Sequence, residues 1–273
     1  MSLIEVKNLT VCDTRNDEVI VKNVSFSVEK NTCLGIVGES GSGKSMSTKA
    51  ILGLINPWLK ATGSAKLGDV ELLDMDKETL RKIRGRRFCM ILQDAMTAFD
   101  PLYTIGAQMI ETLCENTDCT KGEAEQIALE ALEKMLICDP EEVMKKYAHQ
   151  LSGGMLQRCI IGMAMALKPE VIVADEPTTA LDSINQREVL EEFKRLRELT
   201  GMTLIFISHD LGVVQHLADN VLVMRYGECV EYGKVEQIFK NPQHEYSKYL
   251  VDTRIALTKI FREAMCKESN YSC

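Results

Sequence analysis

A loop rich in glycine and serine, residues 38–45, is the part of the sequence best suited to chemistry. It matches G-x-x-x-x-G-K-[ST], a pattern that points backbone N–H groups at a phosphate. The run before it is strand-like and the run after it is helix-like, so a helix amino terminus adds its partial positive charge. Lys44 supplies a cation for the β- and γ-phosphates, and Ser45 supplies a hydroxyl for Mg²⁺. The predicted ligands of a nucleotide are Gly38, Glu39, Ser40, Gly41, Ser42, Gly43, Lys44, Ser45 and Ser47.

Two adjacent carboxylates, Asp175 and Glu176, follow the apolar run 171–174. Acidic residues at the carboxyl end of a buried parallel strand lie where α/β proteins place their sites. We expect Asp175 to hold Mg²⁺, usually through water, and Glu176 to polarise an attacking water as general base. A turn that starts a helix is the alternative reading of the two acids. The phosphate loop upstream favours the catalytic one.

The elements that must position these residues follow from hydrophobic patterning. Alternating and β-branched stretches predict an antiparallel layer, whereas short continuous apolar runs predict buried parallel strands. Charged, helix-forming sequence between residues 100 and 167 predicts a helical subdomain inserted into an α/β core. The predicted strands are 3–11, 19–28, 33–37, a pair within 64–74, 86–92, 171–174, 203–207, 220–224 and 228–232; helices are predicted at 45–54 and 186–199 and at the charged carboxyl terminus.

The composition is that of a soluble globular protein: 45% of the 273 residues are hydrophobic and 26% are charged. A net charge of −8 excludes a protein that coats duplex nucleic acid through a positive field. The ten cysteines form no C-x-x-C pair, so we expect reduced thiols, with Cys33, Cys89 and Cys159 buried in apolar stretches. No apolar run approaches the roughly 18 residues needed to span a bilayer, and no secretory signal is visible.

A further motif narrows the class of phosphate-binding protein. Residues 151–158, Leu-Ser-Gly-Gly-Met-Leu-Gln-Arg, resemble the LSGGQ signature of ABC-type ATPases, with Met155 in the glutamine position. Ser152 is placed to cap a helix whose amino terminus is a second anion site. The resemblance implies a head-to-tail dimer in which Ser152, Gly153 and Gly154 close over the γ-phosphate held by the partner subunit.

The remaining motifs of the ABC family also have counterparts. Gln93 resembles the Q-loop glutamine that touches Mg²⁺ and the attacking water, and the loop after it meets the membrane partner. Asp182 resembles the D-loop residue that crosses the dimer interface, and His209 resembles the switch histidine that contacts the γ-phosphate. The family usually stacks an aromatic residue on adenine, but none lies between Met1 and Val24. Arg15 is a candidate replacement through its planar guanidinium, the alternative being a solvated surface arginine.

The resemblance implies an α/β fold: a P-loop NTPase (RecA-like) core with an antiparallel β layer and an inserted helical subdomain. It places an ABC ATPase domain at residues 1–250, with the core at 1–95 and 168–250 and the helical subdomain at about 96–167. A short helical tail follows at 251–273.

The function that the resemblance implies is an ATP-binding, ATP-hydrolysing subunit of an ABC importer, with Mg²⁺ as cofactor. Its partners would be a second, similar but distinct ATPase chain, membrane permease subunits and, indirectly, an extracytoplasmic solute-binding protein, at the cytoplasmic face of the membrane. Residues 96–101 are more similar to subunits that import nickel or metal–metallophore complexes than to oligopeptide importers, which stay the alternative. A non-transport ABC ATPase would usually show tandem cassettes or a long coiled coil. A binding-only cassette is disfavoured by Glu176, His209 and the signature.

Overall fold

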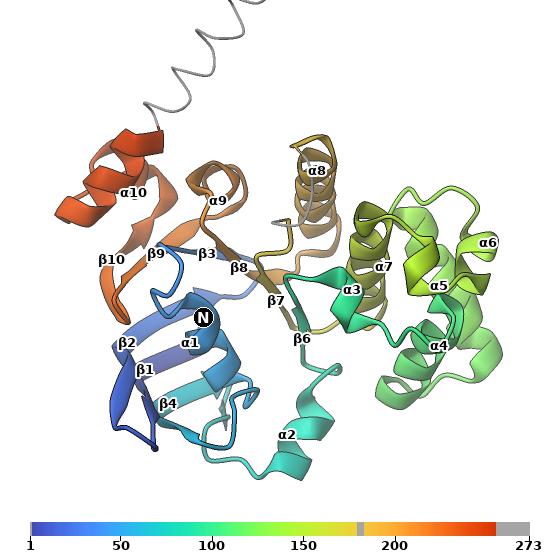
Figure 1. Cartoon of the computed structure of the whole chain (residues 1–273), viewed down its shortest axis with the longest axis horizontal. Coiled ribbons are helices and arrows are strands. Elements are labelled where there is room, and N and C mark those ends of the chain that lie inside the picture. The colour runs from blue at the N-terminus through green and yellow to red at the C-terminus, as the bar shows by residue number, and fades with distance from the viewer. Residues whose placement is uncertain (1, 179–182, 255–273) are drawn as a thin grey trace, which may run out of the picture.

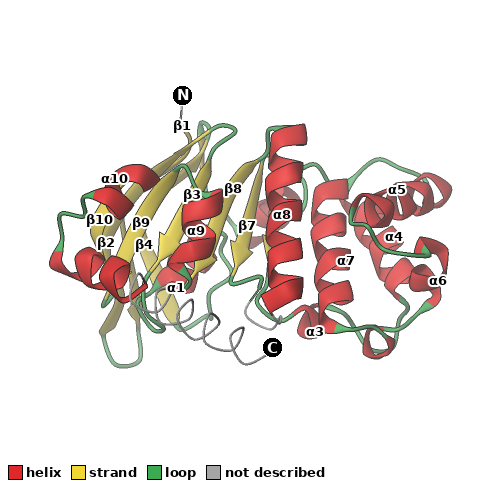
Figure 2. Ribbon diagram, turned by 90° about the horizontal axis from the view of Figure 1, so that it is seen from above, coloured by secondary structure: helices red, strands yellow, loops and turns green. Residues whose placement is uncertain are grey.

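The structure is a computed structural model, and it describes residues 2–178 and 183–254 (Figure 1). Two sheets face each other, and α1 (Lys44–Ile51) lies between them. A group of helices extends from one end of the larger sheet, away from the smaller sheet (Figure 2). Within the described residues, no helix is both long and apolar enough to cross a membrane.

The smaller sheet is antiparallel and has the order β2-β1-β4-β5. Its alternating sequence gives one buried and one exposed face, and opposite residues such as Val6 and Phe26 pair across the two long strands. The prediction of an antiparallel layer agrees with this sheet. The strand pair expected within residues 64–74 begins earlier than predicted, at Leu59, and also ends earlier, at Glu71. The strands are β1 (Ser2–Asp13), β2 (Glu18–Glu29), β4 (Leu59–Leu67) and β5 (Val70–Glu71).

The larger sheet has the order β10-β9-β3-β8-β7-β6, and all its neighbours are parallel except β10 and β9. Every residue of the three central strands is buried, as continuous apolar runs predict. The strands β3, β8 and β7 are adjacent and parallel, so their carboxyl ends lie at the same edge of the sheet. The strands are β3 (Cys33–Val37), β6 (Phe88–Ile91), β7 (Val171–Asp175), β8 (Thr203–Ser208), β9 (Asn220–Arg225) and β10 (Glu228–Lys234).

Helices cover both faces of the larger sheet. The amphipathic α8 (Ser183–Thr200) buries Phe193 edge-to-face against Phe206 of β8, and α9 (Leu211–Leu217) packs on the same core. On the other face, α1 shares a second core with the antiparallel sheet. Beyond β10 the chain forms α10 (Val235–Lys240), and residues 245–254 are helical as far as the structure describes them.

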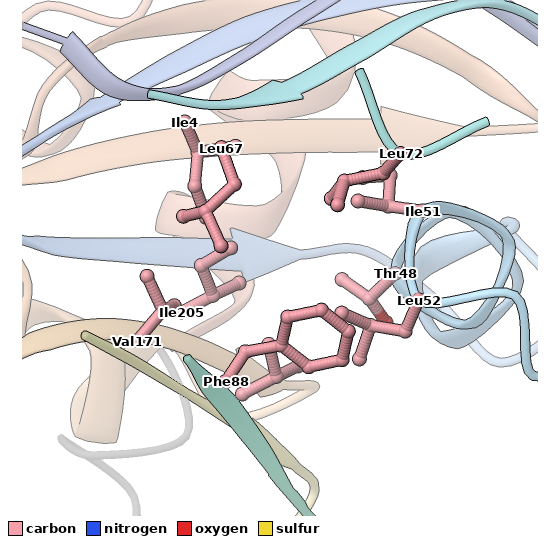
Figure 3. A pocket seen from close by; sticks show the side chains of 10 residues that line it. Ile4, Thr48, Ile51, Leu52, Leu67, Leu72, Phe88, Val171 and Ile205 are labelled. Carbon is pink, nitrogen blue, oxygen red and sulfur yellow. The ribbon is translucent and has the colours of Figure 1, made fainter. Parts of the chain in front are cut away.

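The core beneath α1 is closely packed. Figure 3 shows side chains from α1 and both sheets around an apolar cavity of about 10 Å³. A void of this size holds one water at most and supplies no polar partners for it. The helix that follows the phosphate loop, α1, therefore packs against a rigid core. The lining residues are Ile4, Thr48, Ile51, Leu52, Leu67, Leu72, Phe88, Val171, Val173 and Ile205.

The helical part lies at the end of the larger sheet that β6 forms (Figure 1). Three of its helices, α4, α5 and α7, begin at a side-chain cap: Thr104 caps the first, Thr120 and Glu123 form a reciprocal capping box, and Ser152 caps the helix that carries the signature. The inserted helices agree with the prediction for residues 100–167, although the boundaries at 96 and 167 stay a prediction. One short helix, α2 (Lys77–Ile83), precedes β6. The helices between β6 and β7 are α3 (Ala95–Ala98), α4 (Ile105–Asn116), α5 (Lys121–Lys134), α6 (Pro140–Lys145), the 3₁₀ turn Ala148–Gln150 and α7 (Gly153–Ala166).

Candidate nucleotide site

The loop between β3 and α1 can take its shape only with glycine at its ends. Gly38 has φ 152°, and a Cβ there would lie 2.2 Å from the carbonyl oxygen of Met224. Gly43, with φ 95°, caps α1 in the left-handed region. The carbonyl of Ser42 accepts a hydrogen bond from the Gly227 amide at 3.1 Å, which ties the loop to the β9–β10 turn. The exposed Glu39, Ser40 and Gly41 form the open part of the loop.

Two serines of this region have buried side chains. Among the described residues, the Ser42 hydroxyl has no hydrogen-bond partner, so it is a polar atom that a ligand or water can still satisfy. The Ser47 hydroxyl, in contrast, donates to the Gly43 carbonyl at 2.9 Å and lies 3.8 Å from the sulfur of Met224. Its role as a nucleotide ligand stays a prediction.

Lys44 carries a buried positive charge inside the loop, with its side chain only 4% exposed. Its Nζ donates to the carbonyl oxygens of Gly38 and Glu39, both at 2.9 Å, and lies 4.0 Å from Glu176 Oε1. Burial lowers the pKa of Lys44, and the carboxylates of Glu176 and Asp175 oppose that shift. A desolvated cation held at this point is well placed to receive a phosphate oxygen.

Ser45 and Asp175 bring together two oxygen donors from elements 130 residues apart. The Ser45 hydroxyl donates to Asp175 Oδ1 at 2.6 Å, and Lys49 Nζ lies 3.5 Å from Asp175 Oδ2. A hydroxyl and a carboxylate are hard oxygen ligands of the kind that Mg²⁺ prefers beside a nucleotide phosphate. The donor set therefore fits the predicted cation. We did not predict from the sequence that Lys49 lies in this site. Its position one helical turn after Ser45 places the two residues on the same side of α1 and could have indicated it.

Glu176 stands at the end of β7 in an unusual backbone conformation. Its φ is 47°, and its amide donates to the Ile207 carbonyl at 3.0 Å. Left-handed backbone at a residue other than glycine is costly and concentrates at functional sites. Nδ1 of His209, whose side chain is 57% exposed, lies 3.3 Å from Glu176 Oε2. A carboxylate and an imidazole in this contact can accept and orient the protons of a water.

Gln93 lies two residues beyond the end of β6 and is exposed. Because β6 is parallel to β7 and Ile91 pairs with Ala174, Gln93 leaves the sheet at the same edge as Asp175. The loop after β3 and the residues after β6, β7 and β8 thus share one edge of the sheet, as the strand order requires.

The signature residues lie elsewhere. Ser152 accepts a hydrogen bond from the Met155 amide at 3.3 Å as the cap of α7, and α7 is separated from α1 by β8, β7 and β6 (Figures 1 and 2). A Cβ at Gly153 would meet no atom within 4 Å, so this turn is open to another molecule. Gly154 is buried at the start of the helix. Asp182 lies outside the described residues.

Comparison with known proteins decides the family. The model of the ABC transporter family matches residues 21–179. The chain belongs to this family. The resemblance drawn from its motifs is thereby confirmed, and the chain is an ATP-binding, ATP-hydrolysing subunit of an ABC transporter.

Individual relatives of this ABC ATPase agree with that assignment. It is 42% identical over 265 residues to the metal-staphylopine import system ATP-binding protein CntD of Staphylococcus aureus strain NCTC 8325, covering 97% of this chain and 98% of that one. It is 45% identical over 255 residues to the dipeptide transport ATP-binding protein DppD of Lactococcus lactis subsp. cremoris, covering 92% and 73%.

A solved structure confirms the predicted P-loop fold of the ABC ATPase. The dimeric, post-hydrolysis state of the ATP-binding cassette MJ0796, bound to ADP and Pi, superposes with a TM-score of 0.75 at 28% identity. The match covers 85% of this chain and 98% of that one.

Arg15 of the ABC ATPase is more constrained than either reading of the sequence assumed. Its guanidinium pairs with both carboxylate oxygens of the buried Asp13, the shortest contact being 2.6 Å, and its carbon lies 4.9 Å from the centre of the Trp58 ring. The Trp58 carbonyl accepts hydrogen bonds from the amide and the hydroxyl of Thr14. An aromatic ring therefore does reach this turn, but it comes from Trp58, the residue before β4, rather than from the segment upstream of the loop.

A wide groove lies away from these residues. A groove of about 1040 Å³ separates α5 and α7 from the carboxyl end of α8, at the amino ends of β7 and β8. The groove is therefore at the opposite edge of the sheet from the candidate nucleotide site.

Proposed function

We propose that this subunit binds MgATP at residues 38–45 and hydrolyses it with Glu176 as general base. In this proposal Lys44 neutralises the β- and γ-phosphates, while His209 orients the water and contacts the γ-phosphate. The observation that carries it is the convergence of Lys44, the Ser45–Asp175 pair and the Glu176–His209 pair at one sheet edge. Ser45, Gln93 and Asp175 are the residues that would hold Mg²⁺.

Mg²⁺, when bound, would supply positive charge that offsets the charge of the phosphates. This positive charge is needed because the carboxylates of Asp175 and Glu176 lie beside the loop. Their negative charges repel a triphosphate that carries no cation. We therefore expect ATP without a divalent cation to bind much more weakly than MgATP.

We propose further that the complete site forms between two ATPase chains. Ser152, Gly153, Gly154 and Asp182 would contact the nucleotide of the partner subunit. The separation of the signature helix from α1 and the open face at Gly153 support this arrangement. A similar but distinct second chain is the partner we propose.

The membrane partner would be a permease that contacts the segment after Gln93. Met96, Leu102 and Tyr103 are exposed there, and Leu102 is 78% exposed. Exposed apolar side chains gathered on one segment are typical of an interaction site. Such a contact would hold the subunit at the cytoplasmic face of the membrane, with a solute-binding protein acting on the other face.

For the cargo we propose nickel or a metal–chelate complex taken up by import. The similarity to a metal-staphylopine import protein over nearly the whole of both chains supports this class, while the similarity to dipeptide transport proteins keeps peptides as the second candidate. Uptake of radiolabelled nickel, with and without a metallophore, and of labelled peptide should be compared in a strain lacking this chain. Loss of peptide uptake with normal metal uptake would reverse the assignment.

The experiment that tests the site is substitution of Lys44 by Ala. We expect MgATP affinity to fall by about tenfold or more, since a charge-assisted contact to phosphate is lost. Lys82→Ala is the matched control, because it removes an exposed lysine on α2 that pairs with Glu78 away from the loop, and it should bind MgATP like the wild type. Equal ATP affinity in the wild type and Lys44→Ala would contradict the proposed site.

A further inference from the structure

The carboxyl-terminal segment reaches the phosphate loop through one side chain. Tyr246 is 3% exposed, and its hydroxyl accepts a hydrogen bond from the Glu39 amide at 3.1 Å. The two residues are 207 positions apart in the sequence. Neither catalysis nor cation binding, as described above, uses this contact.

The contact acts on one particular peptide group. The N–H of Glu39 and the carbonyl of Gly38 belong to the same planar unit and point in opposite directions because the peptide is trans. Tyr246 holds the N–H side, and Lys44 Nζ holds the carbonyl side at 2.9 Å. Rotation of this peptide would cost both hydrogen bonds. The tyrosine hydroxyl therefore helps to keep the carbonyl that Lys44 uses in place.

The Tyr246 ring is itself held from several sides. The guanidinium carbon of Arg225, at the end of β9, lies 4.6 Å from the centre of this ring and 4.9 Å from that of Tyr226. The ring of Tyr249 stacks on Tyr246 at 6.4 Å. Burial raises the pKa of the Tyr246 hydroxyl, so it stays neutral across the physiological range.

Separate contacts anchor the segment that carries Tyr246. The Glu231 carboxylate of β10 accepts hydrogen bonds from the amides of Gln243 and His244, at 2.9 and 3.1 Å. His244 Nδ1 in turn lies 3.1 Å from the Tyr246 amide that donates to it. Removing only the hydroxyl should therefore leave the segment in its place.

We propose that Tyr246 is a positioning residue of the nucleotide site, which orients the Gly38–Glu39 peptide and through it Lys44. This inference rests on the proposed phosphate-binding role of residues 38–45. It makes residues 241–254 a functional part of the ATPase, because they carry a group that the loop needs for its binding-competent shape.

The test compares full-length wild type, Tyr246→Phe and Tyr249→Phe. Tyr249 is the matched control, because its ring stacks on Tyr246 while it is itself 57% exposed. We expect Tyr246→Phe to raise the Kd for MgATP by about three- to tenfold, the equivalent of one net hydrogen bond. In the assembled transporter KM should rise while kcat changes less than about twofold, since the hydroxyl touches neither water nor phosphate. Tyr249→Phe should match the wild type.

Two further measurements separate positioning from general stability. Hydrogen exchange of a peptide covering residues 35–44 should speed up in Tyr246→Phe without nucleotide, while the rest of the chain exchanges as in the wild type. If Tyr246→Phe binds MgATP like the wild type, or exchanges faster throughout the chain, the proposal is overturned. If Lys44→Ala also binds normally, the phosphate site itself is wrong and both proposals fall. A loss confined to Lys44→Ala would overturn the role of Tyr246 alone.

Discussion

We expect nucleotide affinity to depend strongly on Lys44, because it is the cation buried within the loop. Burial lowers its pKa from the usual 10.5, so in the free protein it loses its proton at a lower pH than an exposed lysine. Affinity for MgATP should be constant at neutral pH and fall as the pH rises through that lowered pKa. Binding titrations from pH 7 through the usual lysine pKa of 10.5 check this. Constant affinity over that whole range would contradict a binding role for the protonated amine, and Lys44→Met should show no such fall.

The neighbouring carboxylates predict a strong dependence on divalent cations. Asp175 accepts from Ser45 and lies beside Lys49, so replacing it with Asn removes the negative charge and one of the two carboxylate oxygens. We expect Asp175→Asn to weaken the advantage of MgATP over ATP in the presence of EDTA. Affinities measured with and without Mg²⁺ for both proteins provide the test. The same advantage in both would remove Asp175 from the cation site.

At the scale of elements, helix α5 depends on its amino-terminal cap. Thr120 and Glu123 satisfy each other's backbone amides, with Glu123 Oε2 2.8 Å from the Thr120 amide. Thr120→Ala should lower the free energy of unfolding by about 1 kcal/mol. Urea denaturation measures this, and Thr120→Ser should restore the stability. MgATP affinity should stay unchanged in both, since α5 lies far from the loop. A drop in affinity would show coupling that the structure does not account for.

Buried thiols report on the integrity of three elements. Cys33, Cys89 and Cys159 lie inside β3, β6 and α7, and burial raises the pKa of Cys89 and of Cys159 to about 12. At pH 8 they should react with a thiol reagent only as slowly as the protein opens, whereas the exposed Cys138 reacts at once. Cys138→Ser should remove a fast-reacting thiol. Rapid reaction of all the cysteines would contradict the packing of these elements.

How far the sequence predicts these elements depends on how local their determinants are. The strands that begin at Cys33, Val171 and Thr203 are continuous apolar runs, so their burial and their parallel pairing follow from the pattern. Their order brings Glu176 and His209 together. The contact of Arg15 with Trp58 depends on strand register, and that of Tyr246 with Glu39 on packing across 207 residues. Neither of these contacts between distant residues leaves a periodic pattern in the sequence.

At the scale of the whole molecule, the chain has two regions that meet across an open groove. The groove of about 1040 Å³ lies between α5 and α7 on one side and the core on the other. Close packing resists displacement, while a gap of this size permits it. We expect the part that carries the signature to shift relative to the part that carries the phosphate loop when a second chain completes the site.

In the proposed mechanism, Glu176 is the general base of an ATPase whose site closes between two chains. The most direct measurement is steady-state ATP hydrolysis by the assembled transporter carrying Glu176→Gln, with MgATP binding measured on the same sample. The amide keeps the size of the side chain and removes the proton acceptor. We predict retained MgATP binding, lost turnover and a dimer that persists with ATP bound. Hydrolysis at the wild-type rate would show that Glu176 is not the general base.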